Sequence, residues 1–219
     1  MNHSFDPARG FAREASLDRN VYFSEGYFRL KQLCSFAHQI KHIHALRPRR
    51  MLEVGMGNGF VSSYLRNAGI SVITADINPN LLPDFCCDLK DLPSLLNEKF
   101  DMVSCCEVLE HMPWDQFEKS IQIIRRYSDT LFLSLPYGRR RLGLGGFVSM
   151  PLLSGRAIST YIDIPFLKKK LPDEHFWEIN HSRETSMANI FEVLGRYYPK
   201  VTTGCFALNP YHQFFVCRP

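Results

Sequence analysis

One stretch of the chain, residues 53–59, combines a carboxylate with three closely spaced glycines. Glu53 lies in a short apolar run, and Gly55, Gly57 and Gly59 follow it at every second position. Glycines let the backbone turn sharply and bring its N–H groups close to a ligand. The stretch therefore predicts a strand-to-helix turn that binds a nucleotide-like ligand. The nearby acid favours a ligand that carries an amine over one that carries a pyrophosphate.

A dinucleotide-binding turn is the main alternative for this stretch. Its pattern, G-x-G-x-x-G, requires a third small residue close to the strand. Counted from Gly55 and Gly57, that residue would stand at position 60, which is Phe60. The spacing therefore disfavours a nicotinamide-dependent dehydrogenase.

The run from Glu53 to Gly59 reads acidic-x-Gly-x-Gly-x-Gly, and it resembles motif I of the class I S-adenosylmethionine (SAM)-dependent methyltransferases of type 11 and 12. The resemblance implies a Rossmann-like α/β fold with a mostly parallel sheet and an antiparallel last strand. It also implies SAM as the cofactor and S-adenosylhomocysteine as the product. Within the run, the residues expected to hold SAM are Glu53, Gly55, Met56, Gly57, Asn58 and Gly59.

Acidic residues also follow the next two predicted strands. Asp76 stands 21 residues after Gly55, which is near the spacing of a ribose-binding acid. In the methyltransferase interpretation Asp76 accepts from both ribose hydroxyls, and Ile77 covers one adenine face. Asp88 accepts from the adenine amine, and the Leu89 N–H meets a ring nitrogen. Because a strand-end Asp is also an ordinary helix N-cap, only the joint placement of Asp76 and Asp88 on successive strands indicates a cofactor site.

A second informative stretch closes the fourth predicted strand. Its run Leu109-Glu110-His111 resembles a segment that follows the fourth strand in many class I methyltransferases. The favoured interpretation places Cys106 and Glu107 beside the methionine end of SAM. It treats Glu110 and His111 as a structural hydrogen-bonding pair and requires no metal.

The same stretch has a less favoured alternative, a divalent-cation site. Glu107, Glu110 and His111 are spaced i, i+3 and i+4, so they would share one face of a helical turn. Two carboxylates and an imidazole can hold a cation with open positions for substrate oxygens. The spacing resembles the metal-binding run of small-RNA 2′-O-methyltransferases and of ubiquinone-pathway O-methyltransferases. The RNA enzymes also need a later histidine, for which His175 is the candidate.

Methyl transfer from a sulfonium is an in-line displacement that depends on positioning and desolvation. A hydroxyl acceptor also needs a base, and the catalytic candidates are His111, His175 and Glu110. We expect transfer to a small-molecule acceptor, at oxygen. The alternatives are an RNA 2′-O-methyltransferase-like enzyme with the cation site, and a non-catalytic SAM-binding module.

The elements that must position these residues alternate between strand and helix from residue 50 onward, which is typical of a parallel sheet with crossover helices. We expect an N-terminal arm and helical cap over residues 1–48, with its helix at 26–46, and a methyltransferase domain over 49–219. The domain's strands are expected at 51–54, 71–76, 81–87, 100–106, 130–135, 201–206 and 213–217. Its helices are expected at 60–68, 114–127 and 183–194.

Residues 137–172 interrupt this alternation with eight glycines and prolines. Such a long irregular segment is more often a functional lid than a plain connector. We expect a lid insertion after the fifth strand that packs on its own domain. A cover for an apolar acceptor and a patch that touches a membrane surface are alternatives. Tyr22, Phe23 and Trp177 are candidates to complete the acceptor pocket.

Composition limits the class of protein. The 219 residues, 45% hydrophobic and 22% charged, suit one soluble domain with a well-buried core. The net charge of +4 is mild and the basic clusters are short and dispersed, which disfavours nucleic acid as a partner.

The seven cysteines include two adjacent pairs and no C-x-x-C, which indicates buried thiols in a reducing cytoplasm. No signal-peptide core and no run of about 18 apolar residues are found, so no span of a membrane is expected. Peripheral contact with a membrane stays an alternative, and the oligomeric state is not indicated.

Overall fold

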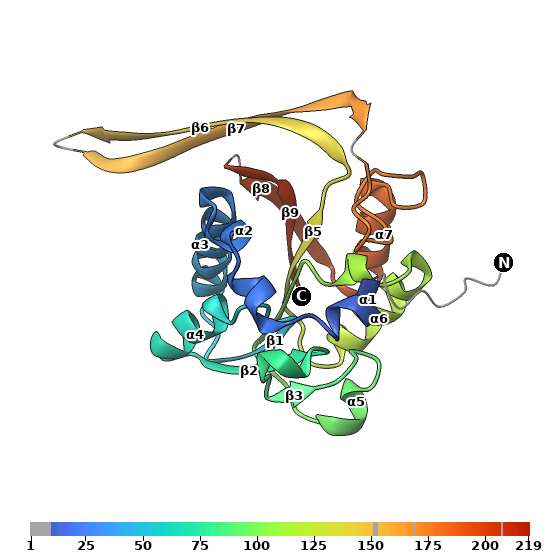
Figure 1. Cartoon of the computed structure of the whole chain (residues 1–219). Helices are drawn as coiled ribbons and strands as arrows, with labels where there is room; N and C mark the ends of the chain where they lie inside the picture. Colours follow the sequence, from blue (N-terminus) through green and yellow to red (C-terminus); the bar gives the residue numbers. More distant parts are fainter. Residues whose placement is uncertain (1–9, 151–152, 169, 207) are drawn as a thin grey trace.

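The computed structural model describes residues 10–150, 153–168, 170–206 and 208–219. Within these residues, seven strands form one sheet, and two further strands pair in a separate ribbon (Figure 1). The strands of the sheet are β1 (Arg50–Val54), β2 (Ser71–Asp76), β3 (Phe85–Cys86), β4 (Met102–Cys106), β5 (Leu131–Pro136), β8 (Lys200–Phe206) and β9 (Asn209–Arg218).

The sheet has the strand order β3-β2-β1-β4-β5-β9-β8. The first five strands pair in parallel, whereas β9 runs antiparallel to both β5 and β8. This arrangement confirms the predicted mostly parallel sheet with an antiparallel last strand. The strand order reverses between β1 and β4, which is where open α/β sheets place their ligand site.

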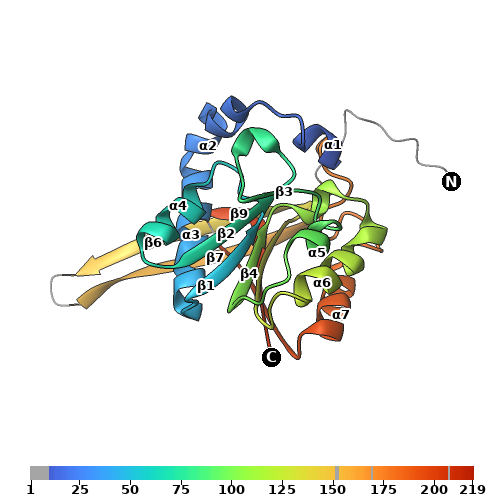
Figure 2. The same cartoon turned by 90° about the horizontal axis from the view of Figure 1, so that it is seen from below.

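Helices cover both faces of the sheet, which explains why its central strands read as continuous apolar runs (Figures 1 and 2). On one face, α3 and α4 bury Ile43 and Leu65 against Met51 of β1. On the other face, α6 and α7 bury Ile121 and other side chains against β5. The helices are α3 (Leu30–Leu46), α4 (Phe60–Asn67), α5 (Leu92–Leu95), α6 (Phe117–Arg125) and α7 (Met187–Tyr197).

The N-terminal segment is more structured than the sequence suggested. It forms α1 (Gly10–Glu14), the 3₁₀ turn η1 (Arg19–Phe23) and α2 (Glu25–Phe28). The single helix predicted over 26–46 is wrong, because Arg29 is extended, with φ −63° and ψ 141°, and separates α2 from α3. Phe28 and Leu30 extend the apolar period of α3 in the sequence, but both are exposed and add no burial that would hold one continuous helix.

Several predicted boundaries also shift. The helix predicted over 183–194 begins at Met187, because the Ser186 side chain accepts the Asn189 N–H as an N-cap. The strand predicted over 81–87 shrinks to β3. Before it lies the 3₁₀ turn η2 (Pro79–Leu81).

Residues 137–172 are not irregular, and this expectation was wrong. Most of them form an antiparallel ribbon of β6 (Arg139–Met150) and β7 (Leu153–Lys168). Both views show its far end projecting beyond the helices of the body (Figures 1 and 2). The strands were not predicted because glycine weakens the sequence pattern of a strand. The hydrogen-bonded ladder between the two strands nevertheless accommodates these glycines. Its role as a lid stays a prediction, as does the division of the chain at residues 48 and 49.

Among the described residues, no helix has both the length and the apolar character needed to cross a membrane. All seven cysteines are free thiols.

Candidate functional site

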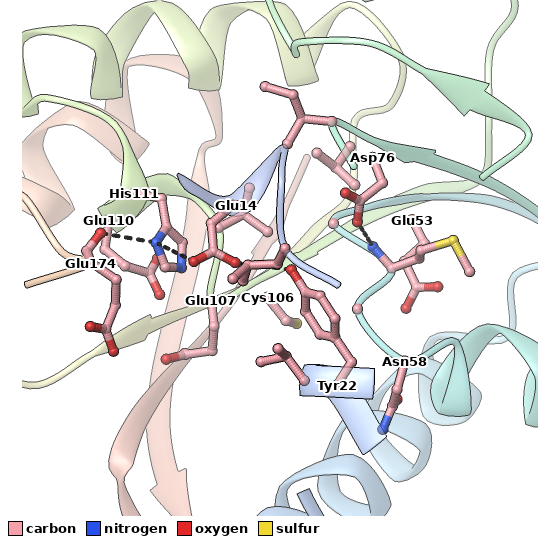
Figure 3. Close-up of a pocket in the computed structure, with 18 of the residues that line it drawn as sticks. Glu14, Tyr22, Glu53, Asn58, Asp76, Cys106, Glu107, Glu110, His111 and Glu174 are labelled. Carbon is pink, nitrogen blue, oxygen red and sulfur yellow. Dashed lines mark hydrogen bonds and ion pairs between the residues drawn. The ribbon is translucent and has the colours of Figure 1, made fainter. Parts of the chain in front are cut away.

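A cavity of about 580 Å³ opens at the carboxyl ends of β1, β2 and β4. The parallel register pairs Val54 with Ala75 on one side and with Cys105 on the other, so the three strands end at one level. The residues that follow these strands therefore meet in one place. Figure 3 shows Glu53, Asn58 and Asp76 at one side of the cavity, and Glu110 and His111 at the other.

The glycine turn is built on backbone conformations that favour glycine. Gly55, Gly57 and Gly59 have φ values of 77°, 53° and 70°. At Gly55 the space is closed as well, because an added Cβ would lie 2.2 Å from a Val108 methyl carbon. Gly59 stands at the N-cap of α4, but unlike Gly55 and Gly57 it does not line the cavity, so its expected contact with the cofactor stays a prediction.

Asp76 ties the glycine turn to β2. Its Oδ2 accepts the Met56 N–H at 2.8 Å, and its Oδ1 accepts the Asn78 N–H at 2.9 Å. Burial raises the pKa of Asp76, and these backbone donors oppose the increase. A carboxylate oxygen can accept more than one hydrogen bond. Asp76 can therefore accept further hydrogen bonds from two hydroxyl groups of a ligand in the cavity.

Glu53 is buried in β1 and lines the same cavity. Its Oε2 has no hydrogen-bond partner among the described residues. Burial raises the pKa of Glu53 to about 8. A buried carboxyl with an unpaired oxygen favours a ligand that brings a positively charged donor.

The remaining residues predicted for this half of the cavity also line it, namely Met56, Asn58, Ile77, Asp88 and Leu89. Asp88 has local partners as well, because it accepts the Lys90 N–H and lies 3.1 Å from Lys90 Nζ. Its part in adenine binding stays a prediction, as do the ligand roles of the others.

Cys106 and Glu107 connect the two halves. Burial raises the pKa of the Cys106 thiol, so it stays protonated and is no nucleophile. Glu107 adopts the left-handed backbone, with φ 55°. Its Oε1 accepts the Ser134 hydroxyl at 2.7 Å, and its Oε2 lies 3.4 Å from His212 Nε2.

Glu110, His111 and His175 form a compact cluster whose potential ligand atoms lie within 4.8 Å of one another. Glu107 is not part of it, so the four residues expected for a cation site are reduced to three. The physical reason is that β4 ends at Cys106 and the next helical turn, the 3₁₀ turn η3 (Leu109–His111), begins only at Leu109. Glu107 therefore does not share the face of Glu110 and His111, and its carboxylate lies near Ser134 and His212.

Glu110 is the most unusual member of the cluster. It is fully buried, and neither carboxylate oxygen has a hydrogen-bond partner among the described side chains and backbone groups. Burial raises the pKa of Glu110 far above its ordinary value, and the acids Glu107, Glu178 and Glu14 add to the increase. The structural hydrogen bond predicted between Glu110 and His111 is therefore absent from the described residues.

The two imidazoles are oriented by groups behind them. His111 Nδ1 lies 3.1 Å from the Glu174 carbonyl oxygen, and His175 Nδ1 lies 3.0 Å from Glu178 Oε1. An acceptor at Nδ1 assigns the proton to that nitrogen and places the lone pair on Nε2. Burial lowers the pKa of His111, so this ring is neutral near pH 7.

The N-terminal segment roofs the cavity, and sequence reasoning missed most of it. The Tyr22 hydroxyl donates to Glu14 Oε2 at 2.9 Å, and Glu14 Oε1 lies 4.0 Å from His111 Nδ1. Gly10 packs so closely that an added Cβ would lie 2.1 Å from the Phe176 ring. Tyr22 was a candidate for the acceptor pocket and does line the cavity. The polar, aperiodic sequence before it gave no signal for the rest.

The acceptor side also contains residues from the end of the chain. Tyr211 and His212 line the cavity, and Tyr211 donates to Glu178 Oε1 at 2.5 Å. The polar run Asn209-Pro210-Tyr211-His212 at the start of β9 was the available signal. Trp177, by contrast, is 2% exposed in the core, where its Nε1 donates to the Met112 carbonyl. The suggestion that Trp177 completes the pocket was therefore wrong.

Comparison with known proteins finds one family model that matches part of this chain. Residues 52–128 match the family model described as a methyltransferase domain. No curated protein matches the sequence of this chain.

Solved structures share the fold at low sequence identity. Magnesium protoporphyrin IX methyltransferase (ChlM) from Synechocystis PCC 6803, with bound SAM, is 17% identical over 100% of both chains, with a TM-score of 0.58. The methyltransferase domain of bacterial CtHen1-CN is 13% identical over 84% of this chain and 97% of that chain, with a TM-score of 0.54. The N-terminal domain of EvdMO1, crystallised with SAH and D-fucose, is 16% identical over 84% of this chain and 82% of that chain, with a TM-score of 0.52. At these identities the likeness shows the fold, a Rossmann-like methyltransferase sheet.

The burial of Glu53 generates a prediction for the ligand-free protein. Its folded pKa of about 8 exceeds the ordinary 4.5, so the folded state holds a proton that the unfolded state has lost between those pH values. Glu53 therefore lowers the free energy of unfolding progressively as pH rises from about 4.5 to about 8. We expect Glu53→Gln to raise the thermal unfolding midpoint by several degrees at pH 8 and by little at pH 5.

Glu184→Gln is the matched control, because it makes the same change at an exposed acid on the loop before α7. Its melting curves should follow those of the wild type at every pH. A Glu53→Gln protein that melts below the wild type at pH 8 would contradict this account of Glu53.

Proposed function

We propose that this chain uses SAM to methylate an oxygen atom of a small molecule, and the match of residues 52–128 to a methyltransferase-domain model supports the proposal. The observation that carries the proposal is the two-part cavity. One part offers the glycine turn, Glu53 and Asp76, and the other offers Glu110 and the imidazoles of His111 and His175.

The residues of the first part fit SAM. The Glu53 oxygen without a partner suits the amine of the methionine moiety, and the acceptor capacity of Asp76 suits the two ribose hydroxyls. The turn around Gly55 and Gly57 lets backbone and ligand approach closely. When bound, SAM supplies an electrophilic methyl group on a sulfonium.

The residues of the second part fit an oxygen acceptor. His111 is neutral, and its Nδ1 proton points to the Glu174 carbonyl, so its Nε2 can take the proton of an acceptor hydroxyl. The N-terminal roof, held by the Tyr22–Glu14 hydrogen bond, limits water around the reacting atoms. The volume of about 580 Å³ suits a cofactor together with a small acceptor.

Substitution of His111 tests the proposal. We expect His111→Gln to bind SAM with nearly the affinity of the wild type and to lose about 10²–10⁴-fold in kcat, because it removes the base but none of the SAM contacts. The measurement is transfer of radiolabelled methyl from SAM to a panel of small alcohols, phenols and sugars. Calorimetry gives the SAM affinity of each protein.

Two outcomes would contradict this proposal. Transfer that is unchanged in His111→Gln would remove His111 as the base. SAM binding without transfer to any acceptor of a broad panel would favour a non-catalytic SAM-binding module.

A second candidate is a methyltransferase that uses a divalent cation at Glu110, His111 and His175. The observation in its favour is the fully buried Glu110 carboxylate, which has no hydrogen-bond partner among the described residues and lies beside two oriented imidazoles. A buried charge without a partner is costly, and a cation would compensate for it. In many metal sites a ligating histidine donates the N–H of its other ring nitrogen to a carbonyl or a carboxylate. His111 and His175 are arranged in this way, with Nδ1 facing the Glu174 carbonyl and the Glu178 carboxylate.

The geometry of the cluster is close to that of a bound metal. Ligand atoms at about 2.1 Å from one ion lie at most about 4.2 Å apart. The potential ligand atoms of the cluster lie within 4.8 Å of one another, so a small side-chain movement would suffice. Two imidazoles and one carboxylate suit Mn²⁺, Co²⁺ or Zn²⁺ better than Mg²⁺ or Ca²⁺. Such an ion would leave positions for acceptor oxygens, which deepens the proposal of oxygen transfer.

Equilibrium dialysis of the purified protein against Mn²⁺, Zn²⁺ or Mg²⁺ tests this candidate. We expect about one equivalent of Mn²⁺ or Zn²⁺ and weaker Mg²⁺. Glu110→Gln and His175→Ala should each reduce the affinity at least about tenfold, because each removes a ligand.

Glu174→Gln is the matched control, since Glu174 lines the same cavity but contributes only its carbonyl oxygen to His111. Its metal affinity should equal that of the wild type. A wild type that binds no metal and transfers methyl groups equally well in EDTA would exclude the cation and leave His111 as the base.

A further inference from the structure

The β6–β7 ribbon is the largest element that the proposed reaction does not use. It pairs Arg140 with Ile164, Leu142 with Ile162, and Leu144 with Thr160. Its root is held to the body by Arg141, whose guanidinium donates to Gln213 Oε1 at 2.6 Å and stacks on the Tyr137 ring. From that root the ribbon runs over the body, and its far end projects past α3 (Figures 1 and 2).

Alternation along β6 gives the root of the ribbon two different faces. Arg141 and Gly143 are half-buried toward the body, whereas Arg140, Leu142 and Leu144 are exposed. Side chains directly opposite each other on paired strands share a face, so Ile162 lies beside Leu142. The exposed fractions are 51% for Leu142, 60% for Leu144 and 60% for Ile162. These four side chains, Arg140, Leu142, Leu144 and Ile162, are called the outer face below.

The charge of the chain is concentrated in the same segment. Residues 139–170 contain seven basic residues and one acidic residue. The rest of the chain contains 19 basic and 21 acidic residues, so the net positive charge of +4 comes from this segment alone. A segment that is both basic and outwardly apolar is suited to an anionic lipid surface, where aliphatic side chains enter the interface and cations meet the headgroups.

We propose that the outer face of the β6–β7 ribbon docks this protein on anionic membrane surfaces. An RNA partner fits less well, because RNA is held by cations together with hydrogen-bonding or stacking side chains. Three of the four outer-face side chains are aliphatic and can do neither. Exposed aliphatic side chains on a projecting ribbon instead gain from leaving water for the acyl boundary.

The attachment of the ribbon relates this surface to the cavity. Arg141 donates to the Pro210 carbonyl and to Gln213, and these two residues flank Tyr211 and His212 in β9. Tyr211 and His212 line the acceptor side of the cavity. The root of the docking ribbon is therefore joined to the acceptor side, through neighbouring residues of one strand.

Vesicle sedimentation with the full chain tests the proposal. The probes are phosphatidylcholine vesicles with and without 30% phosphatidylglycerol, and no SAM or acceptor is added, so the result does not depend on the proposed reaction. We expect sedimentation with the anionic vesicles only, and weaker binding as salt rises. Arg140→Glu and the double variant Leu142→Ser, Ile162→Ser should each weaken binding about tenfold or more.

Leu95→Ser is the matched control. Leu95 is 54% exposed on α5, which lies at the end of the molecule opposite the ribbon in Figure 1. It should sediment like the wild type, and unchanged circular dichroism would show that every variant is folded.

Three results would overturn the proposal. The first is a wild type that does not sediment with either vesicle. The second is vesicle binding that the double variant leaves unchanged, with tighter binding to an RNA oligonucleotide. The third is a wild-type dimer in solution that the double variant converts to a monomer, since the outer face would then be an interface between two copies.

Discussion

The parallel register of β1 with β2 and β4 is the constraint on which the site depends. It aligns Val54, Ala75 and Cys105, so the chain leaves all three strands at one edge of the sheet. The glycine turn, Asp76 and Glu107 lie at that edge, at or directly after the ends of β1, β2 and β4. Helices on both faces hold the register, because Met51, Leu52 and Val103 are buried between them. A slip of one residue would turn these side chains to the opposite faces and separate the acids.

Two buried carboxyl groups in the cavity are the features of this fold that suit ligand binding. Glu53 and Glu110 are both buried, and each has at least one oxygen without a hydrogen-bond partner among the described residues. Such groups destabilise a fold, so they are found mainly where a ligand satisfies them. The two lie in different parts of one cavity, which suits the amine of SAM at one and a proton acceptor or a cation near the other. In the described part of the ligand-free protein these carboxyl oxygens therefore lack hydrogen-bond partners that a bound ligand would supply.

Local sequence patterns predicted those site residues whose positions are set by short segments of the chain. Gly55 to Gly59 and Asp76 were found from the glycine motif and from the rule that strand ends in a parallel sheet meet. Spacing drew attention to Glu110 and His111, whereas His175 came only from a resemblance to enzymes that need a later histidine. The rest depends on distant packing. Glu14 and Tyr22 line the cavity because Gly10 packs against Phe176. Tyr211 lines it because β9 pairs with β5. The ribbon was missed because its glycines resemble a loop, although its strands pair from Arg140 with Ile164 to Val148 with Arg156.

Calorimetric titration of SAM into the purified chain tests the central claim most directly. We predict one site of about micromolar affinity in the wild type. We also predict at least about tenfold weaker binding for Asp76→Ala, because Asp76 both shapes the turn through the Met56 N–H and faces the cavity. Asp84→Ala is the matched control, since Asp84 binds Thr74 and Arg66 outside the cavity. No heat from wild-type protein that is folded by circular dichroism would contradict the account.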